Sequence, residues 1–244
     1  MAVLEVDDVS VTFGGLAALI GVDVVAEAGA VTGLIGPNGA GKTTLFNVIC
    51  GLQRAKRGHV VLDGRDVTGA RTFNRARRGL ARTFQRLEVF GSLTTRENLL
   101  VAAEMQRNGR DPHAVAQEIL SEVGLTEYAD VHVDSIPTGL ARLVELGRAL
   151  ATDPKVLLLD EPSSGLDEAE TDAFGELLLR LAERGLAVLL VEHDVELVMR
   201  VCSQIYVLDF GEIIASGSPD EIRRSAAVQT AYLGSPLSAN GSGR

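Results

Sequence analysis

The sequence predicts an α/β protein with a mostly parallel β-sheet at its core. Two observations carry this prediction. Short aliphatic segments with the length of buried parallel strands recur along the chain, and amphipathic segments with helical periodicity lie between them. The 244 residues, 46% of them hydrophobic, can bury a sizeable core without a disulfide or a structural metal. The composition excludes a disordered or collagen-like chain.

A small antiparallel sheet is expected near the N-terminus. Segments 3–13, 20–26 and 60–62 alternate between apolar and polar residues, and the turn residues Gly14-Gly15 and Asp63-Gly64 follow two of them. Alternation with a period of two, interrupted by such turns, is typical of antiparallel strands. We therefore expect an N-terminal antiparallel β subdomain beside the core.

The expected core strands are Val31–Ile35, 156–159, Ala187–Val191 and 205–208. A helix over 168–184 is expected before the third of them, since its apolar residues recur on one face and Gly185 ends it. A helical stretch over about 94–125 breaks the alternation, with Asp111 as an N-cap before Pro112. It predicts an α-helical subdomain inserted in the core. The small, polar tail 234–244 is expected to be disordered.

Charge and cysteine content exclude several classes of protein. The 33 acidic residues outnumber the 23 basic ones, so we expect no nucleic acid partner. Cys50 and Cys202 lie in apolar surroundings without metal-ligand spacing, which favours buried, reduced thiols. The N-terminus does not read as a signal peptide, and no segment reaches the roughly 18 apolar residues of a membrane span. We expect a cytoplasmic protein that can dock on a membrane-embedded partner.

The strongest motif is G-x-x-x-x-G-K-T, which directly follows the expected strand Val31–Ile35 and precedes an apolar helix. Glycines let backbone N–H groups curl around phosphate oxygens, and the helix N-terminus adds partial positive charge. Lys42 is expected to reach the β and γ phosphates, and the Thr43 hydroxyl to ligate Mg²⁺. The flanking strand and helix disfavour the alternative of a glycine-rich turn without a ligand. The predicted loop residues are Gly36, Pro37, Asn38, Gly39, Ala40, Gly41, Lys42, Thr43 and Thr44.

Two acidic residues directly follow the expected strand 156–159 and complete this site. Asp160 can hold the hydration shell of Mg²⁺, while Glu161 faces the γ-phosphate and polarises a water. A strand ending in Asp-Glu is weak evidence alone. Together with the phosphate loop it indicates hydrolysis of a nucleoside triphosphate on a P-loop (RecA-like) core.

The remaining motifs resemble the nucleotide-binding subunit of an ABC transporter, over about residues 3–233. Phe13 sits where the family places an aromatic ring that stacks on adenine. Gln85 matches the glutamine that senses Mg²⁺ and the γ-phosphate, and Asp167 ends the loop that crosses the dimer interface. His193 matches the switch histidine at the γ-phosphate. The resemblance implies one nucleotide-binding domain over 1–233, with its helical subdomain at about 88–150.

Each of these matches has an ordinary alternative. Phe13 is alternatively a core residue, Gln85 a solvated loop residue, and His193 a cap of the following helix. For His193 the context favours the functional interpretation, because it follows the strand Ala187–Val191, where α/β folds place ligand-facing residues.

One segment departs from the family pattern. Where the family has Leu-Ser-Gly-Gly-Gln at the start of a helix aimed at the ATP of the opposite subunit, this chain has Ile136-Pro-Thr-Gly-Leu140. Gly139 retains the second glycine. Pro137 has neither hydroxyl nor N–H, so the serine contact is either lost or taken over by Thr138. We favour compensation by Thr138, and a weakened contact is the alternative.

Segments 78–85, 87–90, 97–100, 191–199 and 231–234 are similar to the subfamily that serves branched-chain amino acid importers. This resemblance implies an ATPase that uses Mg²⁺, dimerises head to tail with a copy or homologue, and powers amino-acid uptake. Its implied partners are transmembrane permease subunits and, indirectly, a solute-binding protein, at the inner face of the membrane. A regulatory, weakly hydrolysing subunit and a non-transport ABC ATPase remain the alternatives.

Two surface features follow from the same region. The apolar residues Leu87, Val89, Phe90 and Leu93 are expected to form a groove for a permease helix, with burial in the core as the alternative. A cluster of arginines precedes them. We interpret it as the solvated face of a helix, and the alternative is a surface attracted to anionic lipid headgroups. Its members are Arg71, Arg75, Arg77, Arg78, Arg82 and Arg86.

Overall fold

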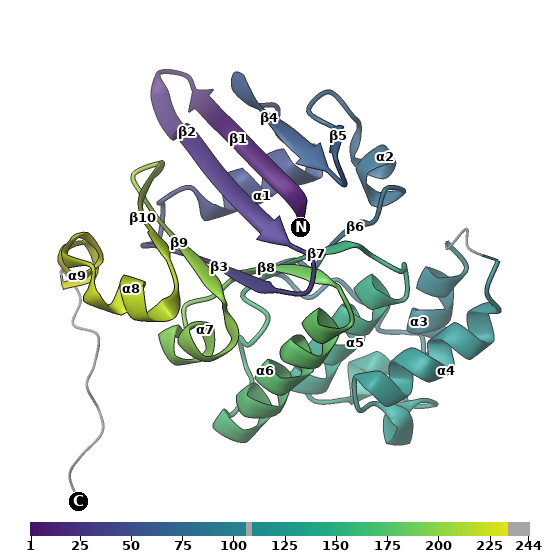
Figure 1. Ribbon diagram of the computed structural model, residues 1–244. Helices are drawn as coiled ribbons and strands as arrows, with labels where there is room; N and C mark the ends of the chain where they lie inside the picture. Colours follow the sequence, from purple (N-terminus) through teal and green to yellow (C-terminus); the bar gives the residue numbers. More distant parts are fainter. Residues whose placement is uncertain (106–108, 234–244) are drawn as a thin grey trace, which may run out of the picture.

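The core of the protein is a six-stranded sheet with the strand order β10-β9-β3-β8-β7-β6 (Figure 1). The computed structural model describes residues 1–105 and 109–233. Five strands run parallel: β6 (Leu80–Arg82), β7 (Val156–Asp160), β8 (Ala187–Val191), β3 (Val31–Ile35) and β9 (Gln204–Asp209). The edge strand β10 (Glu212–Gly217) pairs antiparallel with β9.

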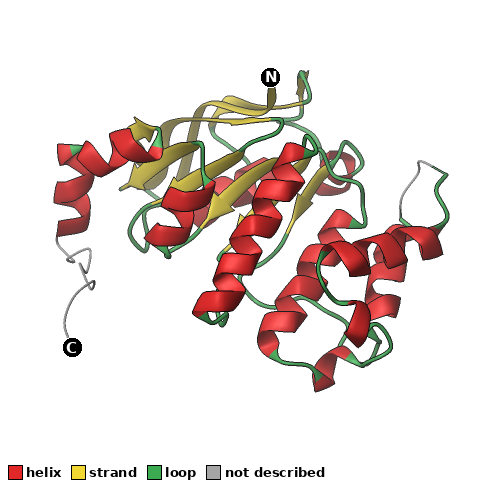
Figure 2. Ribbon diagram, turned by 60° about the horizontal axis from the view of Figure 1, so that its bottom comes forward, coloured by secondary structure: helices red, strands yellow, loops and turns green. Residues whose placement is uncertain are grey.

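A second, antiparallel sheet covers one face of the core sheet (Figure 2). It has the order β2-β1-β4-β5 and comprises β1 (Ala2–Phe13), β2 (Leu16–Glu27), β4 (Arg57–Leu62) and β5 (Arg65–Asp66). The helix α1 (Lys42–Cys50) packs into the same hydrophobic core as this sheet and one face of the large one. The N-terminal strands therefore hold α1 against the core.

Helices cover the opposite face of the large sheet (Figure 2). The helices with residues in the hydrophobic core on this face are α3 (Thr95–Ala103), α4 (Pro112–Glu122), α5 (Thr138–Leu150), α6 (Glu168–Glu183), α7 (Val195–Val201), α8 (Pro219–Arg224) and α9 (Ala226–Leu233), with single turns η1 (Thr126–Tyr128) and η2 (Val133–Ser135). The short helix α2 (Thr72–Ala76) follows β5 and contributes no residue to this core. Among the described residues, no helix combines the length and the hydropathy that spanning a membrane requires.

The strand β7 shows how the sequence builds both faces. Leu157 and Leu159 pack into the helical layer, whereas Val156 and Leu158 pack against α1 and the antiparallel sheet. Successive side chains of a strand point to opposite faces, so a strand covered on both sides is apolar throughout. Each such buried aliphatic side chain stabilises the fold by roughly 1.5–3 kcal/mol. The rigid sheet that results presents Asp160 at its carboxyl edge.

The predicted fold class and most predicted elements are confirmed. The strands Val31–Ile35 and Ala187–Val191 have the predicted bounds. The helix expected over 168–184 is α6, which ends one residue earlier, at Glu183. The Asp111 side chain accepts a hydrogen bond from the His113 N–H at the start of α4, as its N-cap pattern predicted. Both cysteines are buried. The predicted disordered tail 234–244 lies outside the described residues.

The arginine cluster differs from its expected form. Arg75 is buried and donates from Nη1 to the carbonyls of Val48 and Ile49, both at 2.7 Å, at the end of α1. The Arg82 side chain is also buried. Arg71, Arg77, Arg78 and Arg86 are exposed. The expectation of one solvated helix face is therefore wrong for Arg75 and Arg82, which satisfy acceptors inside the fold.

Candidate functional site

The loop between β3 and α1 has the geometry of a phosphate-binding loop. Gly41, which precedes α1, has φ 116° and carries no capping side chain, so N–H groups of the first turn face the loop unsatisfied by the chain's own caps. A Cβ at Gly36 would lie 2.0 Å from the Leu208 carbonyl oxygen, and one at Gly41 would lie 2.7 Å from the Ala18 oxygen. Both positions therefore need glycine. An anion is the ligand that such a helix start favours.

The Lys42 side chain folds back over this loop. Its Nζ donates hydrogen bonds to the carbonyl of Gly36 at 2.6 Å and to that of Pro37 at 3.1 Å. Burial lowers the pKa of Lys42, while the negative charges of Glu161 and Asp160 act in the opposite direction. The loop thus places the Lys42 ammonium at the carboxyl edge of the sheet, where β3 and β7 both end.

Glu161 joins two segments that are distant in sequence. Its Oε2 accepts a hydrogen bond from Gln85 Nε2 at 3.0 Å, and its Oε1 lies 2.7 Å from His193 Nε2. Its backbone adopts the left-handed conformation, with φ 52°, and its N–H donates to the Val191 carbonyl at 2.9 Å. A glutamate in this conformation costs of order 1–3 kcal/mol, which fits a residue held in place by its surroundings.

The structure bears on the ordinary alternatives for three residues. The following helix α7 is capped by Asp194, whose side chain accepts from the Leu197 N–H, so His193 is not its cap. Gln85 is exposed, as a solvated loop residue would be, and its side-chain amide also donates a hydrogen bond to Glu161. Phe13 ends β1 with 48% of its surface exposed, so it is not a core residue and can present a ring face to a ligand.

Asp160 lies at the end of β7, where only 4% of its surface is exposed. Its Oδ2 accepts a hydrogen bond from Arg82 Nη2 at 2.9 Å. Thr43, in the first turn of α1, is exposed. A carboxylate, a hydroxyl and the Gln85 amide supply the hard oxygen ligands that Mg²⁺ prefers, so the donor set fits this ion.

The departing segment 136–140 forms the start of α5. Pro137 occupies the N-cap position, and Thr138 is exposed as the first helical residue. Gly139 is buried, and a Cβ there would lie 2.9 Å from Leu166 Cδ2. Asp167, two positions from Gly165, caps α6 through a hydrogen bond from the Glu170 N–H to its Oδ1 at 2.8 Å. The start of α5 therefore packs on the loop that leads into α6.

Several polar residues of the site were missed by the sequence analysis. Arg142 donates to the carbonyls of Phe84, at 3.0 Å, and Gln85, at 2.7 Å. Glu145, whose pKa is raised by burial, accepts from the Phe84 N–H at 3.1 Å. These charged residues on α5 lie three positions apart and so share one helix face, a spacing that could have pointed to a polar contact.

Glu192 is a further missed residue. It is buried, and its Oε1 accepts from the Ser163 N–H at 2.7 Å. Its Oε2 accepts from the His193 N–H at 3.0 Å. It thereby joins the loop after Glu161 to the backbone of His193.

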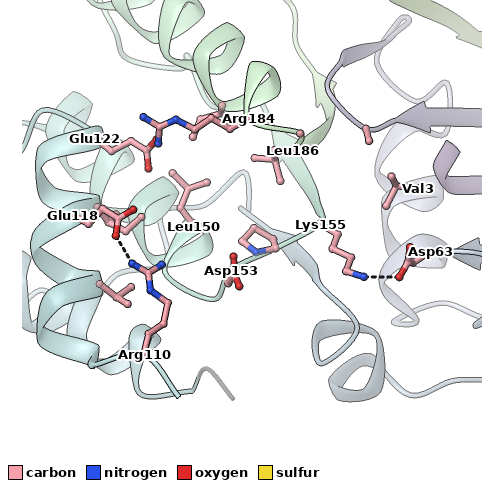
Figure 3. A pocket seen from close by; sticks show the side chains of 16 residues that line it. Val3, Asp63, Arg110, Glu118, Glu122, Leu150, Asp153, Lys155, Arg184 and Leu186 are labelled. Atoms are coloured by element: carbon pink, nitrogen blue, oxygen red, sulfur yellow. Dashed lines mark hydrogen bonds and ion pairs between the residues drawn. The ribbon is translucent and has the colours of Figure 1, made fainter. Parts of the chain in front are cut away.

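A cavity of about 420 Å³ lies at the opposite end of the strands (Figure 3). Lys155, just before β7, and Leu186, just before β8, line it, so it faces the amino ends of these strands. Its charged side chains pair with one another: Lys155 with Asp63 at 2.5 Å, Arg110 with Glu118, and Arg184 with Glu122. It shares no lining residue with the phosphate loop.

Comparison with known proteins identifies the relatives of this chain. The ABC transporter family profile matches residues 19–164, and a profile described as branched-chain amino acid ATP-binding cassette transporter matches 212–237. The chain is 39% identical to the high-affinity branched-chain amino acid transport ATP-binding protein BraF of Pseudomonas aeruginosa, over 95% of this chain and 98% of that protein. It is 33% identical to the lipopolysaccharide export system ATP-binding protein LptB of Haemophilus influenzae, over 96% and 98%. The crystal structure of the ADP conformation of an ATP-binding cassette of an ABC transporter superposes with a TM-score of 0.86, at 30% identity, over 96% of this chain and 99% of that one.

Proposed function

This chain belongs to the ABC transporter family, as an ATP-hydrolysing subunit, and from that premise we propose that it powers the uptake of branched-chain or related amino acids. Two comparisons support this cargo: the relative named for branched-chain amino acid transport, and the C-terminal profile over 212–237. Identity alone does not separate the two classes, since export relatives are 33% and 37% identical and branched-chain relatives 36% and 39%. The C-terminal profile over 212–237 is the finding that favours uptake over export.

The observation that carries the mechanism is the placement of the Glu161 carboxylate between Gln85 and His193. Lys42, Thr43 and the loop amides hold the phosphates of ATP, and Glu161 orients the attacking water. His193 stabilises the charge on the transferring phosphoryl group. Mg²⁺, when bound, neutralises phosphate charge, and Asp160, Thr43 and Gln85 are the residues that would hold it.

The subunit acts as a head-to-tail dimer with a second copy or a homologue. Thr138 and Gly139 contact the ATP held by the opposite subunit, and Asp167 lies at the interface. Phe13 stacks on the adenine ring. The nucleotide-binding domain spans 1–233, with residues 88–150 as its helical subdomain.

The segment after Gln85 contacts transmembrane permease subunits, through which a solute-binding protein delivers the cargo. Leu87 and Val89 are partly buried against the core, whereas Phe90 is exposed at 45%. Their exposed edges and the Phe90 ring offer apolar surface to a permease helix. This contact keeps the subunit at the inner face of the membrane.

The mass of Glu161→Gln in solution, with and without Mg²⁺-ATP, tests the proposal. Light scattering should show an ATP-dependent dimer, because the variant binds ATP but cannot hydrolyse it. The unmutated protein should hydrolyse Mg²⁺-ATP. Glu176→Gln is the matched control: Glu176 is an exposed residue of α6 that pairs with Arg180 at 3.9 Å, so it should behave as the unmutated protein.

The alternative is a regulatory subunit that hydrolyses ATP weakly. The replaced segment 136–140 favours it, because Pro137 lacks the donors of a serine. A Glu161→Gln protein that stays monomeric with ATP, beside an unmutated protein without turnover, would support this alternative and contradict a self-sufficient ATPase.

A further inference from the structure

We propose that Arg82 is a positioning residue that fixes the Asp160 carboxylate relative to the helix carrying Thr43, and so sets the geometry of the Mg²⁺ site. The inference rests on the role proposed above for Asp160. Arg82 is the last residue of β6 and lies three positions before Gln85. Its side chain is buried and bonds Asn47 and Asp160, so we infer that it acts through Asp160.

The Arg82 guanidinium spans two elements with its two terminal nitrogens. Nη2 donates to Asp160 Oδ2 at 2.9 Å, at the end of β7. Nη1 donates to Asn47 Oδ1 at 2.7 Å, on α1. The planar fork of arginine holds its donors in a fixed arrangement, so the two bonds set the separation of Asn47 and Asp160.

The hydrogen bond to Asn47 connects Arg82 to the helix that carries Thr43. Asn47 lies four positions after Thr43, and residues four apart share one face of a helix. The guanidinium therefore fixes Asp160 relative to the face of α1 on which Thr43 lies. Asp160, at the end of β7, and Thr43, on α1, are two of the three residues proposed to hold Mg²⁺.

Aromatic rings hold the guanidinium in place. Its central carbon lies 5.4 Å from the ring centroid of Phe46, on α1, and 4.9 Å from that of Phe84. A cation over such faces is attracted to both rings. Phe84 directly precedes Gln85, so the same guanidinium also contacts the segment that carries the proposed Mg²⁺-sensing glutamine.

Arg82 and Asp160 form a buried ion pair. The Arg82 side chain is 7% exposed and that of Asp160 is 5% exposed. Among the residues that the structure describes, Arg82 Nε is buried without a hydrogen-bond partner. A buried carboxylate needs a partner that pairs with it and orients it. Arg82 leaves the second oxygen of Asp160 for another ligand.

The test separates nucleotide binding from its dependence on Mg²⁺. Binding of N-methylanthraniloyl-labelled AMP-PNP, a non-hydrolysable ATP analogue, is titrated in Mg²⁺ and in EDTA. The ratio of the two affinities is the Mg²⁺-dependent gain. In Arg82→Met this gain should fall by about tenfold, as for the loss of an outer-sphere partner of a metal ligand. The affinity in EDTA should stay within about twofold, because the phosphate loop is untouched.

Arg75→Met is the matched control. Arg75 is equally an arginine buried against α1, but it bonds backbone carbonyls at the end of the helix. It should lower the unfolding midpoint and leave the Mg²⁺-dependent gain unchanged. Asn47→Ala removes the second anchor of the guanidinium and should reduce the gain by several-fold, which keeps the proposal testable if Arg82→Met does not fold.

The outcomes distinguish this inference from the proposed function. If Asp160→Asn retains the full gain, the proposed Mg²⁺ role of Asp160 is wrong. If Asp160→Asn loses the gain while Arg82→Met and Asn47→Ala keep or increase it, Arg82 does not position Asp160. An equal loss in Arg75→Met would show a general effect of a damaged core and would also overturn the proposal.

Discussion

At the scale of single residues, Thr138 stands where this chain departs from its family. It is exposed at the start of α5, between Pro137 and the buried Gly139. A Cβ at position 139 would lie 2.9 Å from Leu166 Cδ2 and 3.2 Å from Glu170 Oε2, so a side chain there would have to displace both of these side chains. The hydroxyl of Thr138 is therefore the side-chain donor that this helix start can offer to a phosphate of the opposite subunit.

Thr138→Val keeps the shape of the side chain and removes this donor. The ATPase rate should fall by about tenfold, the loss expected for one hydrogen bond to a charged group. The free energy of unfolding should change by less than about 0.5 kcal/mol, because the residue is exposed. Thr138→Ser retains the hydroxyl and should retain the rate. Steady-state turnover and denaturant unfolding measure both quantities, and unchanged turnover in the valine variant would show that Thr138 does not replace the serine.

At the scale of elements, one face of α5 holds the backbone of the segment that carries Gln85. Arg142 and Glu145 bond the backbone at residues 84 and 85, and Arg148 donates to the Glu88 carbonyl while its guanidinium lies 4.5 Å from the Phe90 ring centroid. The helix that begins at Thr138 is thus bonded directly to the segment proposed to contact the permease.

Arg142→Met should therefore lower ATP turnover more than ATP affinity. The variant frees the carbonyls of Phe84 and Gln85 and removes the cation that pairs with the buried Glu145, 3.3 Å away. We expect about a tenfold lower ATPase rate, from the loss of charge-assisted bonds, and less than about a threefold change in nucleotide affinity. Arg180→Met, on the exposed face of α6, is the control. If affinity and rate fall together, α5 shapes the binding site itself.

The elements also show which parts of the fold a sequence can predict. The strands β3 and β8 are continuous apolar runs, and their bounds follow from local hydrophobicity. β6 was missed because it has only three residues, Leu80–Arg82, and ends in an arginine that the local pattern marks as solvated. β10 is a half-exposed edge strand without a clear apolar run.

Some residues of the candidate site could likewise be predicted from the sequence, and others could not. The phosphate loop, Asp160 and Glu161 are adjacent in sequence to predicted strands, so their placement was predictable. The contacts of Arg82 with Asp160 and of Glu192 with Ser163 join residues 78 and 29 positions apart. Such partners depend on the order of strands in the sheet, which local periodicity does not contain.

At the scale of the whole molecule, the large sheet separates two hydrophobic cores, and each contains one cysteine. Cys50 ends α1 in the core beneath the antiparallel sheet, whereas Cys202 follows α7 in the helical core. Both are 5% exposed. The two thiols therefore report separately on the opening of each face of the sheet.

Neither thiol should react with iodoacetamide in the folded protein at pH 8. Burial raises the pKa of Cys202 to about 12 and also raises that of Cys50, so little reactive thiolate forms. Mass spectrometry should find both thiols labelled only after unfolding in guanidinium, and Cys50→Ala and Cys202→Ala assign each site. Because the pKa of Cys202 in the folded protein lies above the ordinary thiol value of 9.0, the stability that this thiol contributes is present below pH 9 and is lost as the pH rises toward 12. Labelling of Cys202 alone in the folded protein would show that the helical layer opens while the layer that holds the phosphate loop stays closed.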